Sequence, residues 1–303
     1  MAMGDRPAIQ NHPRVSIRDH TLSLAADGRS LFEALRDLGL GAVELQVDPD
    51  LTTPHLRQTN GVPFSADNDA AVVRLQETLS AQAVRVSALL LMTDFSSEHA
   101  DDHIAWSVRA IRLAEKLGAP VVRLDPLTRD KELPRQVVRD NFIVGVRRIV
   151  ERTPDSTIDI GIENHGPIGN DPVFLDAIFA AVDHPRLGIT LDTGNFYWWG
   201  VALDDLYILL ERYAPRTRHT HIKNINYPPA LANTSRPIGS EYAKYCCPLD
   251  EGNIDLRRVA RILEKAGYRR DLCIENESLQ KYAADQKFDV LRRDVQAIKA
   301  AFL

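Results

Sequence analysis

The chain has 303 residues, of which 44% are hydrophobic, and its formal net charge is −5. Charges of both signs are interspersed without the basic stripe of a nucleic-acid-binding protein, and no apolar run approaches the roughly 18 residues of a membrane span. We therefore expect neither a nucleic-acid nor a membrane partner. Residues 1–13 are polar and lack an apolar core, which predicts a flexible leader rather than a secretory signal.

Short apolar runs bounded by turn residues predict eight β-strands. These strands are 15–22, 42–47, 84–92, 120–125, 157–164, 187–192, 218–223 and 271–275. Between and after them, apolar residues recur every three or four positions, which indicates helices with one apolar face each. The eight apolar stripes begin at Leu31, Val72, Ile104, Val138, Phe174, Leu206, Leu256 and Phe288. Helix-stop signals are expected at Gly39, Gly118 and Gly267.

This alternation predicts a single (β/α)₈ TIM barrel over residues 14–303, since such barrels typically need about 250 residues. An open, doubly wound sheet is the alternative, but no glycine-rich phosphate loop follows the first strand. The longest irregular stretch, 224–252, follows the seventh strand. We expect this loop to cover the barrel mouth or to form a contact in a homo-oligomer.

Three cysteines are present, with Cys246 and Cys247 adjacent and Cys273 alone. An odd number without a framework spacing is typical of proteins in a reducing compartment. We therefore predict a cytoplasmic location.

Four ionisable residues interrupt the ends of the last four strands. They are Glu163, Asp192, His221 and Glu275. Because side chains alternate along a strand, all four can point into the barrel at its C-terminal mouth. Three carboxylates in one enclosed space repel each other, and a divalent cation removes that repulsion. Mixed carboxylate and imidazole ligands suit Mn²⁺, Mg²⁺, Co²⁺ or Zn²⁺, and we favour one Mn²⁺.

A buried salt-bridge network is the alternative interpretation, with Arg123 and Lys223 neutralising the acids. Residues close to the four strand ends are also candidates for substrate binding, although each has a structural explanation such as packing, helix capping or ion pairing. These candidates are His165, Asn195, Lys223, Arg123, Trp198 and Glu277.

The C-terminal half resembles the xylose isomerase-like barrel superfamily, in particular its sugar phosphate isomerase/epimerase group. The matching pieces are Ile162-Glu163, Leu191-Asp192-Thr193-Gly194-Asn195, His219-x-His221-Ile222-Lys223-Asn224, Glu251-Gly252-Asn253-Ile254-Asp255 and Ile274-Glu275. The resemblance implies that Glu163, Asp192, His221 and Glu275 are the metal ligands. In the ketose 3-epimerases of this group, both glutamates also act as acid and base.

The chain departs from the epimerases at three positions. Asn195 stands where they have a histidine, Gly169 where they have a glutamate, and Tyr227 where they have an arginine. The metal centre therefore carries over, whereas an assignment to free ketohexoses does not. The related enzymes that cleave C-glycosides through 3-keto sugars share the same first step and are the runner-up.

We predict a divalent-metal-dependent isomerase or epimerase that acts on a keto sugar or derivative through a metal-bound enediolate, with Glu163 and Glu275 as the acid/base pair. Two other classes are less favoured. An apurinic endonuclease of the same superfamily would need further histidines, and the strand 84–92 has none. A non-catalytic sugar-binding barrel would not need two flanking glutamates.

Overall fold

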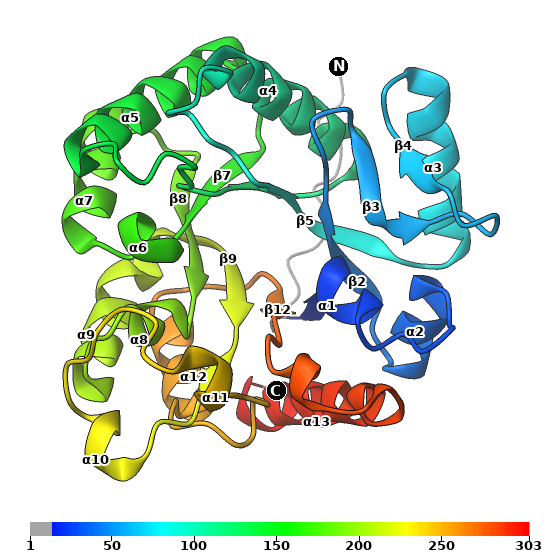
Figure 1. Cartoon of the computed structure of the whole chain (residues 1–303). Helices are drawn as coiled ribbons and strands as arrows, with labels where there is room; N and C mark the ends of the chain where they lie inside the picture. The colour runs from blue at the N-terminus through cyan, green and yellow to red at the C-terminus, as the bar shows by residue number, and fades with distance from the viewer. Residues whose placement is uncertain (1–13, 303) are drawn as a thin grey trace.

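The computed structural model describes residues 14–302. Eight parallel strands close into a barrel in the order β1, β12, β9, β8, β7, β6, β5, β2, and helices surround it (Figure 1). The barrel strands are β1 (Val15–Arg18), β2 (Ala42–Gln46), β5 (Arg85–Leu91), β6 (Val121–Leu124), β7 (Asp159–Glu163), β8 (Leu187–Asp192), β9 (Thr217–Ile222) and β12 (Leu272–Ile274). The predicted TIM barrel is confirmed; the leader predicted for 1–13 lies outside the described residues.

Eight outer helices, one after each barrel strand, carry the eight apolar stripes that the sequence indicates. They are α2 (Leu31–Asp37), α3 (Asp69–Ala81), α4 (Ala100–Leu117), α5 (Arg135–Arg152), α7 (Pro172–Val182), α9 (Leu203–Tyr213), α12 (Leu256–Lys265) and α13 (Ala284–Phe302). Their buried faces pack on the barrel and form one continuous hydrophobic core with it. Gly39, Gly118 and Gly267 follow three of these helices with φ of 66°, 70° and 78°, a conformation that costs glycine little.

Shorter helices and strands lie in the loops that connect the barrel strands and the outer helices. They are the helices α1 (Asp19–Ser23), α6 (Gly166–Gly169), α8 (Asn195–Trp198), α10 (Pro229–Ala232) and α11 (Tyr242–Tyr245), the 3₁₀ turns η1 (Ala214–Arg216) and η2 (Leu279–Lys281), the hairpin β3 (Thr52–Arg57) with β4 (Pro63–Ser65), and the pair β10 (Asn224–Ile225) with β11 (Cys246–Cys247). The hairpin after β2 was not among the predicted strands. The β10–β11 pair ties together the two ends of the stretch expected to be irregular.

The first strand is shorter than its apolar pattern predicts, because β1 ends at Arg18 and α1 begins at Asp19. The carboxylate of Asp19 accepts hydrogen bonds from the backbone N–H groups of Gln46, at 3.0 Å, and His20, at 2.7 Å. These side-chain bonds replace ladder bonds where the chain turns away from the barrel. The prediction of a strand through residue 22 is therefore wrong.

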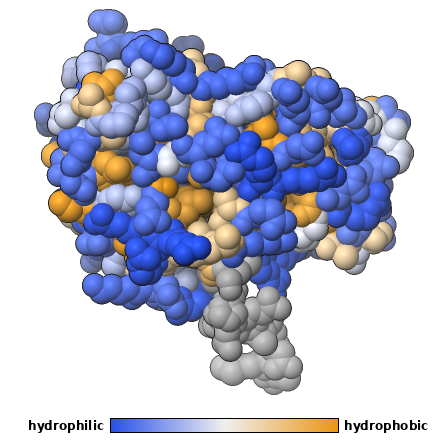
Figure 2. All heavy atoms as spheres, turned by 90° about the horizontal axis from the view of Figure 1, so that it is seen from below, coloured by the Kyte–Doolittle hydropathy of each residue, from blue (hydrophilic) through white to orange (hydrophobic). Residues whose placement is uncertain are grey.

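The outer surface is mainly hydrophilic on the face seen in Figure 2, with smaller apolar areas between polar ones. Among the described helices, none is both long and apolar enough to cross a membrane.

Candidate metal centre

The four predicted ligand residues converge at the C-terminal ends of β7, β8, β9 and β12, which are neighbours in the barrel. One possible ligand atom from each of Glu163, Asp192, His221 and Glu275 lies within 4.8 Å of the others. The Nδ1 atom of His221 is 2.7 Å from Oε1 of Glu163 and 3.5 Å from Oε2 of Glu275. All four side chains are buried. The arrangement thus places three carboxylates and one imidazole around one point.

The pKa values of Asp192 and Glu275 are shifted by burial and by the charges crowded around these carboxylates. Burial raises the pKa of Asp192 to about 7, although Lys223 acts against the rise, and the nearby charge of Glu275 adds to it. Burial also tends to raise the pKa of Glu275, but Lys223 and His221 outweigh it and hold that pKa well below its usual range. The backbone N–H groups of Gly194 and Asn195 donate to Oδ1 of Asp192, while its Oδ2 makes no hydrogen bond and lies 3.2 Å from Nζ of Lys223. This oxygen fits a cation ligand.

Three basic side chains surround the acids. Arg123 contacts Glu163 and places its Nη1 3.1 Å from Oδ2 of Asp125. Lys223 places its Nζ 3.0 Å from Oε2 of Glu275, 3.2 Å from Oδ2 of Asp192 and 3.4 Å from Oε2 of Glu277. Arg18 contacts Glu275.

The buried salt-bridge network proposed as the alternative is therefore partly present. It does not neutralise all of the carboxylates, however. Six carboxylates lie in this cluster, those of Glu44, Asp125, Glu163, Asp192, Glu275 and Glu277, against the three cations of Arg18, Arg123 and Lys223. A divalent ion would offset most of the remaining negative charge, and the oxygen and nitrogen donors present suit such an ion.

Two of the predicted substrate-binding residues, His165 and Glu277, lie beside the candidate metal centre. His165 follows β7, is partly exposed, and places its Nδ1 2.9 Å from Oδ1 of Asp125. One atom each of Asp125, Glu163 and His165 also falls within 4.8 Å of the others. Glu277 follows β12, is 38% exposed at its side chain, and accepts a hydrogen bond from the hydroxyl of Tyr242 in α11.

The two remaining candidates, Asn195 and Trp198, pack against other segments of the protein. Asn195 is buried at the start of α8 with its side-chain nitrogen unpartnered, and it makes no side-chain cap. Trp198, at the end of α8, accepts a backbone hydrogen bond from Gly239 and packs on the hydrophobic core. Its neighbours Phe196 and Tyr197 are fully buried. Trp198 thus contacts the 224–252 segment rather than the candidate metal centre.

Sequence reasoning missed Arg18 and Tyr242. Arg18 ends β1 in register with Glu44 of β2, and the rule that identified the other sites, an ionisable residue at a strand end, would have found it. The predicted strand ran on to residue 22 and placed Arg18 in its middle. Tyr242 had no such signal, because only the folded path of the 224–252 segment brings it to Glu277.

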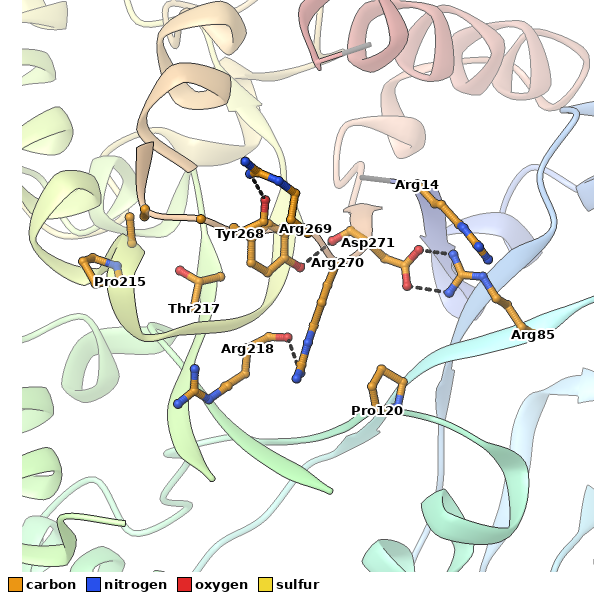
Figure 3. Close-up of a pocket in the computed structure, with 13 residues that line it drawn as sticks. Arg14, Arg85, Pro120, Pro215, Thr217, Arg218, Tyr268, Arg269, Arg270 and Asp271 are labelled. Carbon is orange, nitrogen blue, oxygen red and sulfur yellow. Dashed lines mark hydrogen bonds and ion pairs between the residues drawn. The ribbon is translucent and has the colours of Figure 1, made fainter. Parts of the chain in front are cut away.

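A cavity of about 580 Å³ lies at the opposite end of the barrel (Figure 3). Several arginines line it, but Arg85 is paired with Asp271, and Arg270 with Asp159. These residues stand at the N-terminal ends of the strands, whereas the chemistry of TIM barrels is placed at the C-terminal ends. We therefore assign this cavity no part in the site.

Fold and site together define a (β/α)₈ barrel with a mixed carboxylate–imidazole centre at its C-terminal mouth. The family model for the xylose isomerase-like TIM barrel matches residues 32–299, and the chain belongs to this family.

Individual relatives are more distant. Inosose dehydratase from Klebsiella pneumoniae is 28% identical over 108 residues, which cover 34% of this chain and 35% of that protein. The match to this curated relative thus spans about a third of its length. The IolI protein with a bound zinc atom has a TM-score of 0.69 at 15% identity, covering 95% of this chain and 99% of that one.

Two further solved structures share the fold. One is a xylose isomerase-like TIM barrel protein from Mycobacterium smegmatis in complex with magnesium, with a TM-score of 0.69 at 20% identity. The match covers 98% of this chain and 100% of that one. An L-ribulose 3-epimerase has a TM-score of 0.66 at 17% identity and covers 95% of each chain.

Proposed function

We propose that this protein is a divalent-metal-dependent isomerase or epimerase that acts on a keto sugar or a closely related polyhydroxy ketone. One observation carries the proposal. Glu163 and Glu275 come from β7 and β12, with Asp192 on β8 and His221 on β9 between them. Two carboxylates thus flank one point from the two ends of a four-strand arc, as proton transfer on both faces of a substrate requires.

Glu163, Asp192, His221 and Glu275 would hold the ion, and we favour Mn²⁺. When bound, such an ion polarises the carbonyl and adjacent hydroxyl oxygens of a substrate and makes the neighbouring C–H acidic. Solved relatives carry zinc in one case and magnesium in another, which supports a divalent site without choosing the metal.

In this proposal Glu163 and Glu275 carry out the proton transfer. The carboxylate of Glu163 removes the proton from the carbon beside the carbonyl, which leaves an enediolate. Glu275, on the other side, must first take up a proton from solvent, which it then gives to the same carbon for epimerisation or to the former carbonyl carbon for isomerisation. In the second case the hydroxyl proton of the first carbon also passes to the other oxygen, and in both cases Glu163 releases its proton to solvent. Lys223, whose pKa is raised well above its usual value because Asp192 and Glu275 outweigh the effect of burial, stays cationic and stabilises the developing negative charge.

The charge of the site favours an unphosphorylated substrate. Each of Arg18, Arg123 and Lys223 already contacts one or more carboxylates. Recognition of a phosphate group normally uses an arginine or lysine that is free to bind it. We therefore propose a neutral polyhydroxy ketone, with His165 and Glu277 as the hydrogen-bonding partners of its hydroxyl groups.

A lyase reaction is the second candidate, and the inosose dehydratase relatives favour it. Removal of the same proton followed by loss of a hydroxyl group gives dehydration, and loss of an aglycone from a 3-keto glycoside gives C-glycoside cleavage. In either case the leaving group needs a proton, which Glu275 or His165 is placed to supply.

The test is a panel of keto sugars, keto cyclitols and 3-keto glycosides incubated with Mn²⁺ in D₂O and followed by NMR. Epimerisation places deuterium at the carbon beside the carbonyl, whereas elimination gives an unsaturated product. The Glu163→Gln protein should lose exchange by roughly 10²–10⁴-fold, the usual contribution of a general base. Turnover by the parent protein without exchange at any carbon would contradict solvent-linked enolisation and favour a hydride shift.

A further inference from the structure

A second buried layer lies in the barrel next to the metal ligand His221. Its members are Glu44 on β2 and His219 on β9, and both are 1% exposed or less. Oε2 of Glu44 is 2.8 Å from Nε2 of His221, and Oε1 of Glu44 is 3.3 Å from Nε2 of His219. Each carboxylate oxygen of Glu44 therefore faces one imidazole.

The two nitrogens of His221 face different surroundings. Nδ1 lies 2.7 Å from Glu163 and 3.5 Å from Glu275, on the side of the proposed ion, while Nε2 faces Glu44. A neutral imidazole carries one N–H, and an ionised carboxylate can only accept a hydrogen bond. With an ion bound at Nδ1, the one ring proton is therefore on Nε2, where it is donated to Glu44. Without the ion, Nδ1 lies 2.7 Å from a carboxylate oxygen of Glu163 and can carry the proton instead. With the ion present, this opposite tautomer would place a lone pair against a buried carboxylate and an N–H against the ion.

We propose that Glu44 is a positioning residue, which fixes the tautomer and ring orientation of His221 so that Nδ1 is presented to the metal ion. This inference rests on the metal centre of the proposed function. His219 lies 3.3 Å from the second oxygen of Glu44, without hydrogen-bond geometry, and limits rotation of the carboxylate by contact. Such carboxylate–histidine–metal arrangements also raise the basicity of the ligand nitrogen, and their loss typically costs 10–100-fold in metal affinity.

An ion held by the layer itself is the competing explanation. Glu44, His219, His221 and Cys273 also bring four possible ligand atoms within 4.8 Å of one another. However, His221 would then give both of its nitrogens to metal ions and would have to lose its last ring proton. Cys273 would also have to give up the thiol proton that it directs at Glu44, where its Sγ lies 3.7 Å from Oε2. The single-ion arrangement avoids both costs.

The decisive variant is Glu44→Gln, which keeps the size of the side chain. The amide has one accepting oxygen, so it can satisfy only one of the two histidines, and its NH₂ group faces the other. We expect the affinity for Mn²⁺, measured by chelator competition and Mn²⁺ EPR, to fall 10–100-fold. His219→Gln, which leaves Glu44 and His221 intact, should give a smaller loss. Cys273→Ser is the matched control. Serine keeps a donor beside Oε2 of Glu44, which Sγ of Cys273 approaches to 3.7 Å, so this variant should bind Mn²⁺ like the parent protein.

Two further readouts separate positioning from a general loss of structure. Urea unfolding with chelator present reports whether the metal-free variants are folded, and ¹⁵N NMR of the parent protein reports the tautomer of His221. In the proteins loaded with diamagnetic Zn²⁺, we expect the proton on Nε2 in the parent and a mixture of tautomers in Glu44→Gln. If Glu44→Gln does not fold, the smaller affinity loss in His219→Gln and the tautomer in the parent carry the test.

The outcomes are distinct. A parent protein that binds no ion refutes the metal centre of the proposed function, and the inference with it. One bound ion with equal affinity in the parent and Glu44→Gln, or a proton on Nδ1 of His221 in the Zn²⁺-loaded parent, overturns the positioning role alone. Two ions per chain, with one lost in Cys273→Ser, would show that the layer is itself a metal site and would also overturn it.

Discussion

The guanidinium group of Arg123 on β6 contacts Oε2 of Glu163 on the neighbouring strand β7, and both side chains are almost completely buried. Arg123 also lies 3.1 Å from Asp125. One buried cation therefore stabilises two buried carboxylates, one of which is the proposed base.

Removal of this cation should destabilise the metal-free protein. We predict that Arg123→Met lowers the free energy of unfolding by roughly 3–5 kcal/mol, because Glu163 and Asp125 keep their buried charge with only the imidazoles of His221 and His165 beside them. Urea unfolding in the presence of a chelator measures the loss. Saturating Mn²⁺ should reduce it, since the ion would take over the charge of Glu163. The control is Arg139→Met, which breaks the exposed pair with Asp140 and should cost at most about 1 kcal/mol. Equal losses in the two variants would show that the buried pair has no special role.

The 224–252 segment reaches the site through Tyr242, whose hydroxyl donates to Glu277, which in turn lies 3.4 Å from Lys223. We predict that Tyr242→Phe raises KM roughly 2- to 10-fold, the effect of losing one hydrogen bond that holds a substrate-binding carboxylate. Affinity for Mn²⁺ should stay unchanged, because Tyr242 contacts none of the four ligands. Tyr245→Phe, in the same helix, is the control. An unchanged KM in Tyr242→Phe would mean that the segment has no role in substrate binding.

Asp294 in α13 makes stability depend on pH. Burial raises its pKa to about 7, despite hydrogen bonds from the side chain of Asn276 and the backbone N–H of Leu249. Between pH 4 and 7 the folded protein keeps a proton that the unfolded chain releases, so the free energy of unfolding should fall as pH rises and level off above pH 7. The contribution of this residue is at most roughly 4 kcal/mol.

The Asp294→Asn protein should lose this part of the pH dependence, which urea unfolding between pH 4 and 8 measures. Asp19, whose pKa burial also raises to about 7, keeps its own contribution in that variant. If the two proteins show the same slope, Asp294 is ionised throughout this range.

Much of the fold could be predicted because barrel strands and their covering helices have strong, repeated apolar patterns. All eight strands and all eight outer helices follow such patterns. The β3–β4 hairpin did not, since Thr52–Arg57 is polar in places and contains a proline, and its pairing with Pro63–Ser65 is irregular. The end of β1 was missed for a related reason, because the apolar run continues into α1 and the turn depends on the side-chain bonds of Asp19.

The same distinction holds for the candidate site: residues at strand ends could be predicted, whereas contacts that depend on the folded barrel could not. Glu163, Asp192, His221 and Glu275 stand at strand ends, where alternation and topology fix the direction of a side chain. The contact of Arg18 with Glu275 joins residues 257 positions apart, and no spacing in the sequence encodes it. The contacts of Glu44 with His219 and His221 of β9 likewise depend on the closure of the barrel by its first and last strands, β1 and β12.

The metal content of the purified protein tests the central claim most directly. We predict one divalent ion per chain by elemental analysis after reconstitution and removal of excess metal, with ligand distances of about 2.0–2.4 Å in a crystal structure. His221→Ala should hold less than a tenth of an equivalent under the same conditions, since losing one of four ligands opens the centre to the chelator. A parent protein without bound metal, or a His221→Ala protein that keeps a full equivalent, would contradict the assignment of Glu163, Asp192, His221 and Glu275 as the metal centre.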